Sequence, residues 1–308
     1  MHTKAIARAS LLGLVLGSLM GLSAPAGVAQ DACLYGIAAG ERALYRVHAG
    51  GSSWIGAIGP IAADADLAML EDAGGGLAYT IDRRANVLHT VRLSDARVVA
   101  SVPLDVDVWV TRRGLARSPE GDLYGLLPGM DLRTIDPATG ATAQVGPVTG
   151  AGMIESLAFA PDGRLFATGS QGTRFSDALY LIDRATAAAT LVASLPVPDA
   201  DVLTFASDGS LYAADSGGFD ADLWRIDPAT GELANLGTTG IRELNGLAHA
   251  PCPCRADLDG DGELTLFDFL AFAILFDLGS TLADFDNDGE LTIFDFLAFQ
   301  TAFAEGCP

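Results

Sequence analysis

The chain has very little positive charge. Its 308 residues include 18 lysines and arginines against 39 aspartates and glutamates, and Lys4 is the only lysine. The formal net charge is −21 at pH 7. A surface of this sign repels nucleic acid and anionic lipid headgroups, so we expect neither nucleic-acid binding nor membrane insertion. The same charge attracts cations.

Long apolar runs are scarce, and the clearest one lies at the N-terminus. Lys4 and Arg8 precede the apolar segment Leu11–Ser23, and small residues follow, with cleavage expected after Ala26 or Ala29. This order is typical of a secretory signal peptide, which we place at residues 1–29. An uncleaved membrane anchor is the alternative, but the run is short and interrupted by Gly and Ser. We therefore expect a secreted protein, either extracellular or associated with the cell surface.

Cysteine is also rare, with four residues: Cys33, Cys252, Cys254 and Cys307. An even number in a secreted chain indicates disulfides, and four cysteines allow three pairings. Cys252 and Cys254 are too close to pair comfortably with each other. We favour the pairs Cys33–Cys252 and Cys254–Cys307 on the domain organisation described below. A metal site is the alternative, although no usable histidine lies nearby.

Recognisable catalytic motifs are missing from the region between the first and second cysteines. No nucleophile motif, zinc-ligand spacing or glycine-rich phosphate loop stands out there. The four histidines are scattered, and we expect them to be structural: His2, His48, His89 and His249.

A repeat with a period of a little over forty residues fills this region. One register is a Leu-aromatic step, as in DLYGLL from Asp122 and SLYAAD from Ser210. A second register precedes it by about eight residues and begins at Leu67, Leu115, Leu157, Leu203 and Leu247. Each unit holds about four short apolar or alternating segments. Four strands at this period are typical of a propeller blade, so the fold class is mainly β, with a five-bladed β-propeller at residues 31–251.

The separators between these segments carry turn chemistry. In Asp136–Gly140 and Asp227–Gly231 the aspartate opens the turn, proline presets φ, and glycine accepts a positive φ. The segments Pro161–Gly163 and Ser207–Gly209 do the same between the first two strands of a unit. The pattern resembles the broad WD/NHL/YVTN-like group of propellers.

The ends of the repeat suggest how the ring closes. The first unit lacks its leading strand, and a spare leading strand, NGLAHAP, follows the last unit. We predict that Leu247–Ala250 joins the first blade, which would place Cys33 beside Cys252. A solenoid, an open β-sandwich and a sixth degenerate blade are the alternatives.

Two acidic loops begin 27 residues apart, at Asp257 and Asp284, and both fit the EF-hand loop template. Gly262 and Gly289 stand at loop position 6, where the chain turns sharply. A hard cation needs six to eight oxygen ligands, so we predict two calcium ions as cofactors. The expected ligands are Asp257, Asp259, Asp261, Glu263, Thr265 and Asp268 in the first loop and Asp284, Asp286, Asp288, Glu290, Thr292 and Asp295 in the second.

The helices expected after these loops, LFDFLAFAILF from Leu266 and IFDFLAFQTAF from Ile293, are apolar almost all round. A two-helix module buries about one face of each helix, so the remaining apolar side chains must meet something else. That partner is either another protein or the propeller itself. The near-identity of the two halves also predicts a surface with two-fold pseudo-symmetry.

These features resemble a dockerin, in particular the bacterial type that ends in Gly-Cys, here Gly306-Cys307. Dockerins have Asp at loop position 12, as at Asp268 and Asp295, and lack a helix before the first loop. The resemblance places a dockerin at residues 252–308 and implies docking onto a cohesin-like protein module, often in polysaccharide-degrading assemblies. The partner-binding residues would be Leu266, Phe267, Leu270, Ile293, Phe294 and Leu297. A Cys254–Cys307 disulfide would clasp the ends of the module.

Polar residues precede several second-register strands and form a candidate ligand site at one mouth of the central channel: Arg113, Glu155, Asp201 and Asn245. The segment starting at Asn245 resembles part of the lactonase-type propellers, in which the matching Asn binds a metal. Our main hypothesis is a non-enzymatic binding protein, anchored outside the cell through calcium, whose propeller could take a small-molecule or glycan ligand. The alternative is a dockerin-anchored propeller enzyme, lactonase-like or a carbohydrate-active hydrolase.

Overall fold

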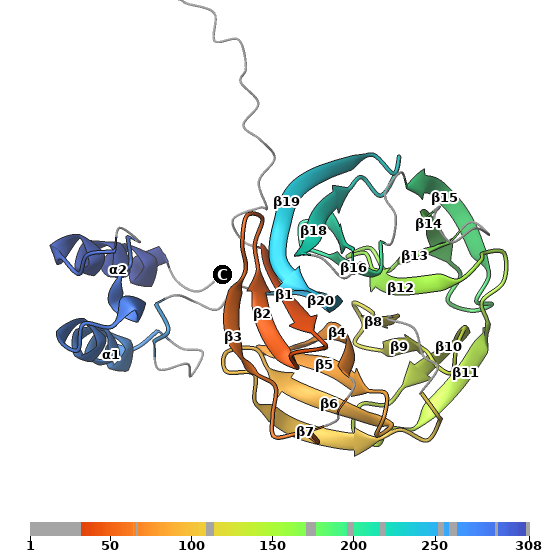
Figure 1. The fold of residues 1–308 in the computed structure, drawn as a ribbon, viewed down its shortest axis with the longest axis horizontal. Coiled ribbons are helices and arrows are strands. Elements are labelled where there is room, and N and C mark those ends of the chain that lie inside the picture. The colour runs from red at the N-terminus through yellow and green to blue at the C-terminus, as the bar shows by residue number, and fades with distance from the viewer. Residues whose placement is uncertain are drawn as a thin grey trace, which may run out of the picture.

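The computed structural model describes residues 32–63, 65, 67–108, 114–170, 177–195, 200–215, 220–251, 256–258, 264–286 and 289–305. Within these ranges the fold is mainly β, with five four-stranded antiparallel sheets arranged in a ring and two helices that follow them in the chain (Figure 1). The predicted signal peptide lies outside the described residues. None of the described helices is both long and apolar enough to cross a bilayer.

Each sheet is one blade, listed here from its inner strand outward. Blade 1 contains β20 (Leu244–Pro251), β1 (Ala32–Ala38), β2 (Ala43–Val47) and β3 (Ser53–Ala57). Blade 2 contains β4 (Leu67–Gly74), β5 (Leu77–Asp82), β6 (Val87–Arg92) and β7 (Val98–Pro103). Blade 3 contains β8 (Leu115–Arg117), β9 (Leu123–Leu126), β10 (Asp131–Ile135) and β11 (Thr142–Pro147). Blade 4 contains β12 (Ile154–Phe159), β13 (Leu165–Ser170), β14 (Asp177–Ile182) and β15 (Ala189–Leu195). Blade 5 contains β16 (Val202–Phe205), β17 (Leu211–Ala214), β18 (Asp220–Ile226) and β19 (Leu233–Arg242).

The burial of each strand depends on its position in the blade, from the inner strand to the outermost one. The second strands, such as β9 (LYGL) and β17 (LYAA), are buried along their whole length because neighbouring blades cover both of their faces. The residues of the outermost strands β7 and β11 are all exposed or half-buried. Continuous apolar runs therefore mark the inner part of each blade.

The predicted turns form as expected. Gly140 and Gly231 have φ values of +76° and +74°, which a residue with a side chain adopts only with strain. Asp136 and Asp227 accept hydrogen bonds from the backbone N–H groups two residues ahead, at 2.9 and 2.8 Å. These side-chain bonds fix the tight reversal between the third and fourth strands of blades 3 and 5.

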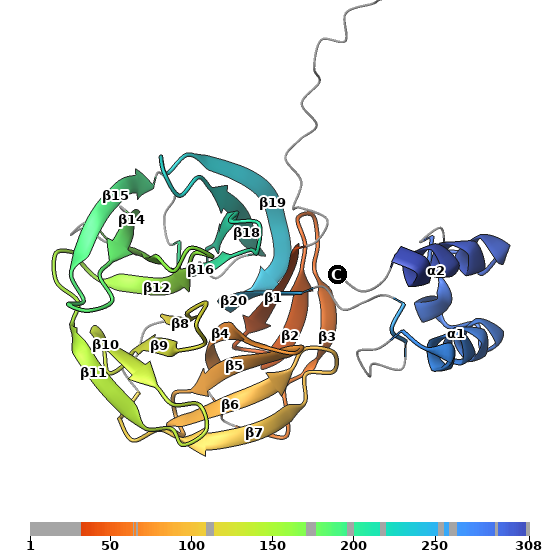
Figure 2. The ribbon, with the colours of Figure 1, turned by 180° about the vertical axis from the view of Figure 1, so that it is seen from behind.

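Strand β20 closes the ring by pairing with β1, as the spare leading strand predicted. The two strands are antiparallel, with a register that runs from Ala32 opposite Pro251 to Ala38 opposite Leu244. The inner strands β4, β8, β12, β16 and β20 contact one another around the axis, which Figure 2 shows from behind. The prediction of five blades is confirmed, and the solenoid, sandwich and six-blade alternatives were wrong.

The core of the ring lies between the blades. One buried cluster joins Tyr35 and Leu44 of blade 1 to Leu67 and Val91 of blade 2. Another joins blade 5 to blade 1, so the last blade and the first pack together like any other pair. Each blade therefore depends on both of its neighbours for burial of its apolar faces.

The closing register also bears on the predicted disulfides. Cys33 stands opposite Ala250, two residues before Cys252. Cys252, Cys254 and Cys307 lie outside the described residues, so both predicted disulfides stay predictions.

The C-terminal part forms the two predicted helices, α1 (Leu266–Asp277) and α2 (Ile293–Glu305), with the short 3-10 helix η1 (Thr281–Ala283) between them. Their core is built from residues after position 255 only. Its members recur at the 27-residue offset of the loops, as Ala256 with Ala283 and Phe272 with Phe299 do. Phe272 and Phe299 stack with their ring centroids 4.5 Å apart.

Ring closure predicts the effect of a cavity in β20. Leu247 is 2% exposed and packs in the cluster that joins blades 5 and 1. We expect Leu247→Ala to lower the free energy of unfolding by about 2–5 kcal/mol, and to lower it for the whole ring in one transition. Urea unfolding followed by circular dichroism measures the change.

The matched control is Leu191→Ala on the outer strand β15, where the side chain is 51% exposed. We expect this variant to change the unfolding free energy by about 0.5 kcal/mol or less. Equal effects of the two substitutions would contradict the role assigned to β20.

Candidate functional site

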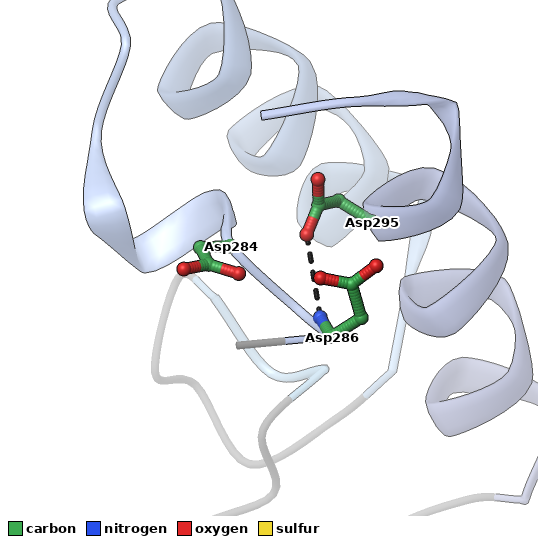
Figure 3. Close-up of side chains that lie close together, drawn as sticks. All are labelled: Asp284, Asp286 and Asp295. Carbon is green, nitrogen blue, oxygen red and sulfur yellow. Dashed lines mark hydrogen bonds between the residues drawn. The ribbon is translucent and has the colours of Figure 1, made fainter. Parts of the chain in front are cut away.

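The second acidic loop brings three carboxylates together. One oxygen each from Asp284, Asp286 and Asp295 lies within 4.8 Å of the others (Figure 3). Among the described residues this is the one group of three or more potential metal-ligating side chains so arranged. Three carboxylates at one point match the hard oxygen ligands that calcium prefers.

Asp295 lies at the base of this loop, in the first turn of α2, and is fully buried. Its two oxygens accept hydrogen bonds from the backbone N–H groups of Phe285 and Thr292, each at 2.7 Å, and of Asp286 at 3.3 Å (Figure 3). The Thr292 N–H, with those of Asp286 and Phe285, lowers the pKa of the Asp295 carboxyl below its ordinary value. The carboxylate is therefore ionised and tied to both ends of the loop.

Gly289 shapes the same loop. It has a φ of +84°, and its N–H donates to Asp284 Oδ2 at 3.0 Å. This bond folds loop position 6 back over position 1, which is the sharp turn that the sequence predicted. A residue with a Cβ would be strained there.

The first loop has the same framework. Asp268 is fully buried and accepts hydrogen bonds from the N–H groups of Leu258 at 2.8 Å and Thr265 at 2.7 Å. The Thr265 hydroxyl accepts from Phe267 N–H at 3.1 Å, so Thr265 and Asp268 form a capping box at the start of α1. Thr292 accepts from Phe294 N–H in the same way, also at 3.1 Å.

Several predicted ligands are not placed. Asp259, Asp261, Glu263 and Asp288 lie outside the described residues. Of the others, Asp257 is half-buried at the start of the first loop, and Glu290 is exposed after Gly289. The structure therefore describes the two ends of each loop, and it brings three predicted ligands together in the second.

The predicted partner-binding side chains are all exposed. Exposed fractions at equivalent positions agree between the helices: 70% and 63% for Leu266 and Ile293, 65% and 63% for Phe267 and Phe294, and 51% and 50% for Leu270 and Leu297. Burying these large apolar side chains would be favourable, so the two faces are suited to contact with another surface. Which surface they meet stays a prediction.

The structure places three of the four predicted channel-mouth residues, and their role as a ligand site stays a prediction. Glu155, Asp201 and Asn245 are half-buried at or just before the N-terminal ends of β12, β16 and β20, and Arg113 lies outside the described residues. The inner strands run in one direction around the ring, so these residues stand at one mouth of the channel.

The opposite mouth holds a cavity of about 320 Å³. Residues at the C-terminal ends of all five inner strands line it, including Glu71, Asp72, Arg117, Phe205 and His249. We call this the channel cavity. Its position on the axis means that no single blade forms it.

Two β-bulges place two neighbouring acidic residues on the channel cavity. The register of β4 with β5 shifts between Ala68 and Glu71 and again between Asp72 and Gly74. Consecutive residues of a regular strand point to opposite faces, whereas bulges redirect side chains. Glu71 and Asp72 lie between the two bulges, and both line the cavity.

Burial dominates the electrostatics of this pair. Desolvation raises the pKa of the Glu71 carboxyl to about 8, against the opposing effect of the Arg117 backbone N–H that donates to it. Desolvation also raises the pKa of Asp72, opposed by the N–H of Gly74 and the positive charge of Arg117. Glu71 is therefore mainly protonated at neutral pH.

His249 enters the channel cavity from β20. Burial lowers the pKa of its imidazole, so the ring is neutral at pH 7. Its backbone N–H donates to Thr204 Oγ1 at 3.1 Å, and its ring Nε2 has no hydrogen-bond partner among the described residues. The expectation that His249 is only structural therefore misses its position on the cavity.

A signal for this cavity was present in the second register. Arg117, Phe159, Phe205 and His249 each stand two residues after the leucine that begins it, and all four line the cavity. The fifth equivalent position is Met69, where the bulge in β4 brings Glu71 and Asp72 to the cavity instead. Chemically varied residues at one repeat position therefore gather at this cavity.

Among known proteins, the chain is similar to solved structures at low sequence identity. No protein-family model matches the chain, and no curated protein matches it. Among solved structures it is similar to virginiamycin B lyase from Staphylococcus aureus, at 14% identity over 68% of each chain with a TM-score of 0.39. It is also similar to a protein of unknown function from Bacteroides caccae, at 12% identity over 70% of this chain and 85% of that one with a TM-score of 0.43. It is similar as well to a chain of a nidogen/laminin complex, at 15% identity over 71% of this chain and 85% of that one with a TM-score of 0.47.

The raised pKa of Glu71 predicts a pH dependence of stability. Between about pH 4.5 and pH 8 the folded protein holds a proton on Glu71 that the unfolded chain has released. Stability is therefore lost as pH rises through this window, at up to about 1.4 kcal/mol per pH unit. We expect Glu71→Gln to remove this contribution, measured by urea unfolding at pH 5, 6 and 7.

Glu232→Gln, at an exposed position in the turn between β18 and β19, is the matched control and should keep the wild-type slope. If Glu71→Gln kept the wild-type slope of unfolding free energy against pH as well, Glu71 would not hold the extra proton.

Proposed function

We propose that this chain is a secreted, calcium-dependent docking protein. Its C-terminal loop–helix pair would bind two calcium ions and dock onto a cohesin-like module, and its propeller would serve as an interaction module of an extracellular or cell-surface complex. The observation that carries the proposal is the Asp284, Asp286 and Asp295 cluster, set in one of two loops that share a sequence and a hydrogen-bond framework.

The residues present fit calcium. Asp295 accepts two backbone N–H groups at Oδ1 and one at Oδ2, so Oδ2 keeps a lone pair for a cation. Asp284 and Asp286 stand beside it with flexible, exposed or half-buried side chains. Calcium tolerates such variable geometry, whereas magnesium demands a near-ideal octahedron.

Calcium would couple the loops to the helices. Asp268 and Asp295 cap the first turns of α1 and α2 and accept N–H groups from the start of each loop. Neutralising their charge with a cation would lock the loop ends onto the helix starts. The exposed faces of the two helices would then have a fixed spacing, which a docking partner needs.

The docking surface has two equivalent halves. Leu266, Phe267 and Leu270 on α1 correspond to Ile293, Phe294 and Leu297 on α2, with nearly equal exposure. A partner that recognises one half would also fit the other after a half-turn. This supports docking to a separate protein in either of two orientations.

Calcium titration tests the first part of the proposal. We expect calorimetry on the full chain to show two bound ions, and Asp284→Ala to weaken one site at least tenfold, about 1.4 kcal/mol. Asp257→Ala should weaken the other, and the double variant should lose both. Helical circular dichroism should rise with calcium in the wild type only.

The control is Asp162→Ala, which removes an exposed carboxylate from a propeller turn and should leave both sites intact. An absence of binding at millimolar calcium in the wild type would reject the calcium loops and, with them, the docking proposal.

Docking is tested with a panel of recombinant cohesin modules in calcium and in chelator. We expect Phe267→Asp and Phe294→Asp each to retain binding through the other half, whereas the double variant loses at least about 2 kcal/mol of binding energy. The exposed propeller residue Trp54, replaced by Asp, is the control. Binding that persists in chelator or in the double variant would overturn the docking proposal, as would a panel without any calcium-dependent binder.

A further inference from the structure

The channel cavity is a built site on the propeller, separate from the calcium loops. Its lining comes from all five blades, and its volume of about 320 Å³ lies at the lower end of small-molecule sites, which run from roughly 300 to 1,000 Å³. Axial cavities of this kind depend on the whole ring, so their walls are rigid. The question is which chemistry fits the lining.

The charges of the lining largely balance one another. Asp72 and Arg117 are close enough that the arginine lowers the pKa of the carboxyl, and Glu71 is mainly protonated at neutral pH. His249 is neutral. The negative charge of Asp208, on the turn after β16, acts to raise the pKa of its imidazole, against the larger effect of burial. Asp72 also faces Tyr35 of β1, which in turn lies near Arg46 of β2. A nearly neutral site of this kind selects neither a strong anion nor a strong cation.

A metal ion is a poor fit. No group of three ligating side chains including Glu71, Asp72 or His249 lies within ligand distance among the described residues. Arg117 would also repel a cation held by the two carboxyls. The site is therefore better suited to an organic ligand.

The lining instead offers mixed hydrogen-bond donors and acceptors. A protonated Glu71 can donate and accept, Asp72 accepts, and Arg117 donates. The Nε2 of His249 has no hydrogen-bond partner among the described residues but is itself buried, so a ligand in the cavity would meet other atoms of this half-buried ring. Several donors and acceptors in a small space match a ligand with several hydroxyl groups.

Apolar edges complete the cavity. Phe159 and Phe205 reach the lining and are held by tilted contacts with Tyr124 and Phe166, both with ring centroids 5.3 Å apart. The two residues are 8% and 9% exposed, so they offer the cavity fixed apolar edges rather than open ring faces. A sugar ring has hydroxyls around its edge and C–H groups on its faces, and so presents the same two chemistries.

We propose that the channel cavity binds a neutral saccharide unit, with Asp72 and Arg117 as its polar contacts and with His249 and Phe205 as its walls. The site stands on the mouth opposite to Glu155, Asp201 and Asn245. It needs no calcium, so its success or failure is independent of the docking proposal.

The test uses the full chain in chelator, with glucose, galactose, mannose, xylose and N-acetylglucosamine as probes. We expect saturation-transfer NMR to detect at least one of them, and calorimetry or NMR titration to show at least tenfold weaker binding in Asp72→Asn and in His249→Ala. Glu232→Gln, in the exposed turn between β18 and β19, is the control and should bind as the wild type does. Unfolding curves of each variant verify that the ring stays intact.

The protonation of Glu71 gives a second readout. We expect wild-type binding to weaken as pH rises from 7 to 9, because Glu71 ionises beside Asp72, while Glu71→Gln binds with no such fall. The saccharide proposal would be wrong if none of the sugars bound, or if the Asp72 and His249 variants bound them as tightly as the wild type does. Spermidine serves as a cationic probe, and its binding in the cavity instead of the sugars would also overturn the proposal.

Discussion

The pairing of β20 with β1 is the contact on which the propeller depends. Each blade buries its apolar faces only against its two neighbours, so an open ring would expose the faces of blades 1 and 5 together. Completing blade 1 with a strand from the far end of the sequence ties the last segment to the first. The channel cavity is a consequence of this closure, because its lining includes His249 of β20 as well as residues from the other four inner strands. Folding of the ring and formation of the cavity are therefore one event.

The helical module builds its core from few residues. Its core centres on the stacked pair Phe272 and Phe299, around which equivalent side chains repeat at the 27-residue offset. The contact of Phe269 with Phe299 at 4.9 Å has its counterpart in that of Phe272 with Phe296 at 5.9 Å. Each helix turns one aromatic face inward, so an equally apolar face stays outside at equivalent positions of both helices. A module with so small a core has a small free energy of unfolding. Bound ions or partners would raise that free energy by mass action.

Repetition decides what could be predicted from the sequence. The five leucines of the second register and the turn at Asp136–Gly140 predicted the blades, because the same strand and turn chemistry recurs at a fixed period. Asp268 and Asp295 were predicted at equivalent places for the same reason. Glu71 and Asp72 were missed because two β-bulges in β4 break the repeat there, and a bulge has no sequence pattern of its own. The site predicted at Glu155, Asp201 and Asn245 lies at the other mouth and stays a prediction, because polarity before a strand is also ordinary loop chemistry.

The course of the chain links the two ends of the protein. Strand β20 ends at Pro251, two residues beyond His249 on the channel cavity, so the chain leaves the ring at that mouth. Ala256, the first buried residue of the helical module, follows five residues later, and five residues span at most about 18 Å. Figures 1 and 2 show the helical module outside the ring, beyond β3, the outermost strand of blade 1. A partner docked as we propose would therefore be held beside the propeller. A tether this short raises the effective concentration of any ligand carried by the docking partner or by its substrate. Weak binding of a single sugar unit in the cavity would then suffice for function, since docking would supply the proximity that the small cavity cannot supply through affinity.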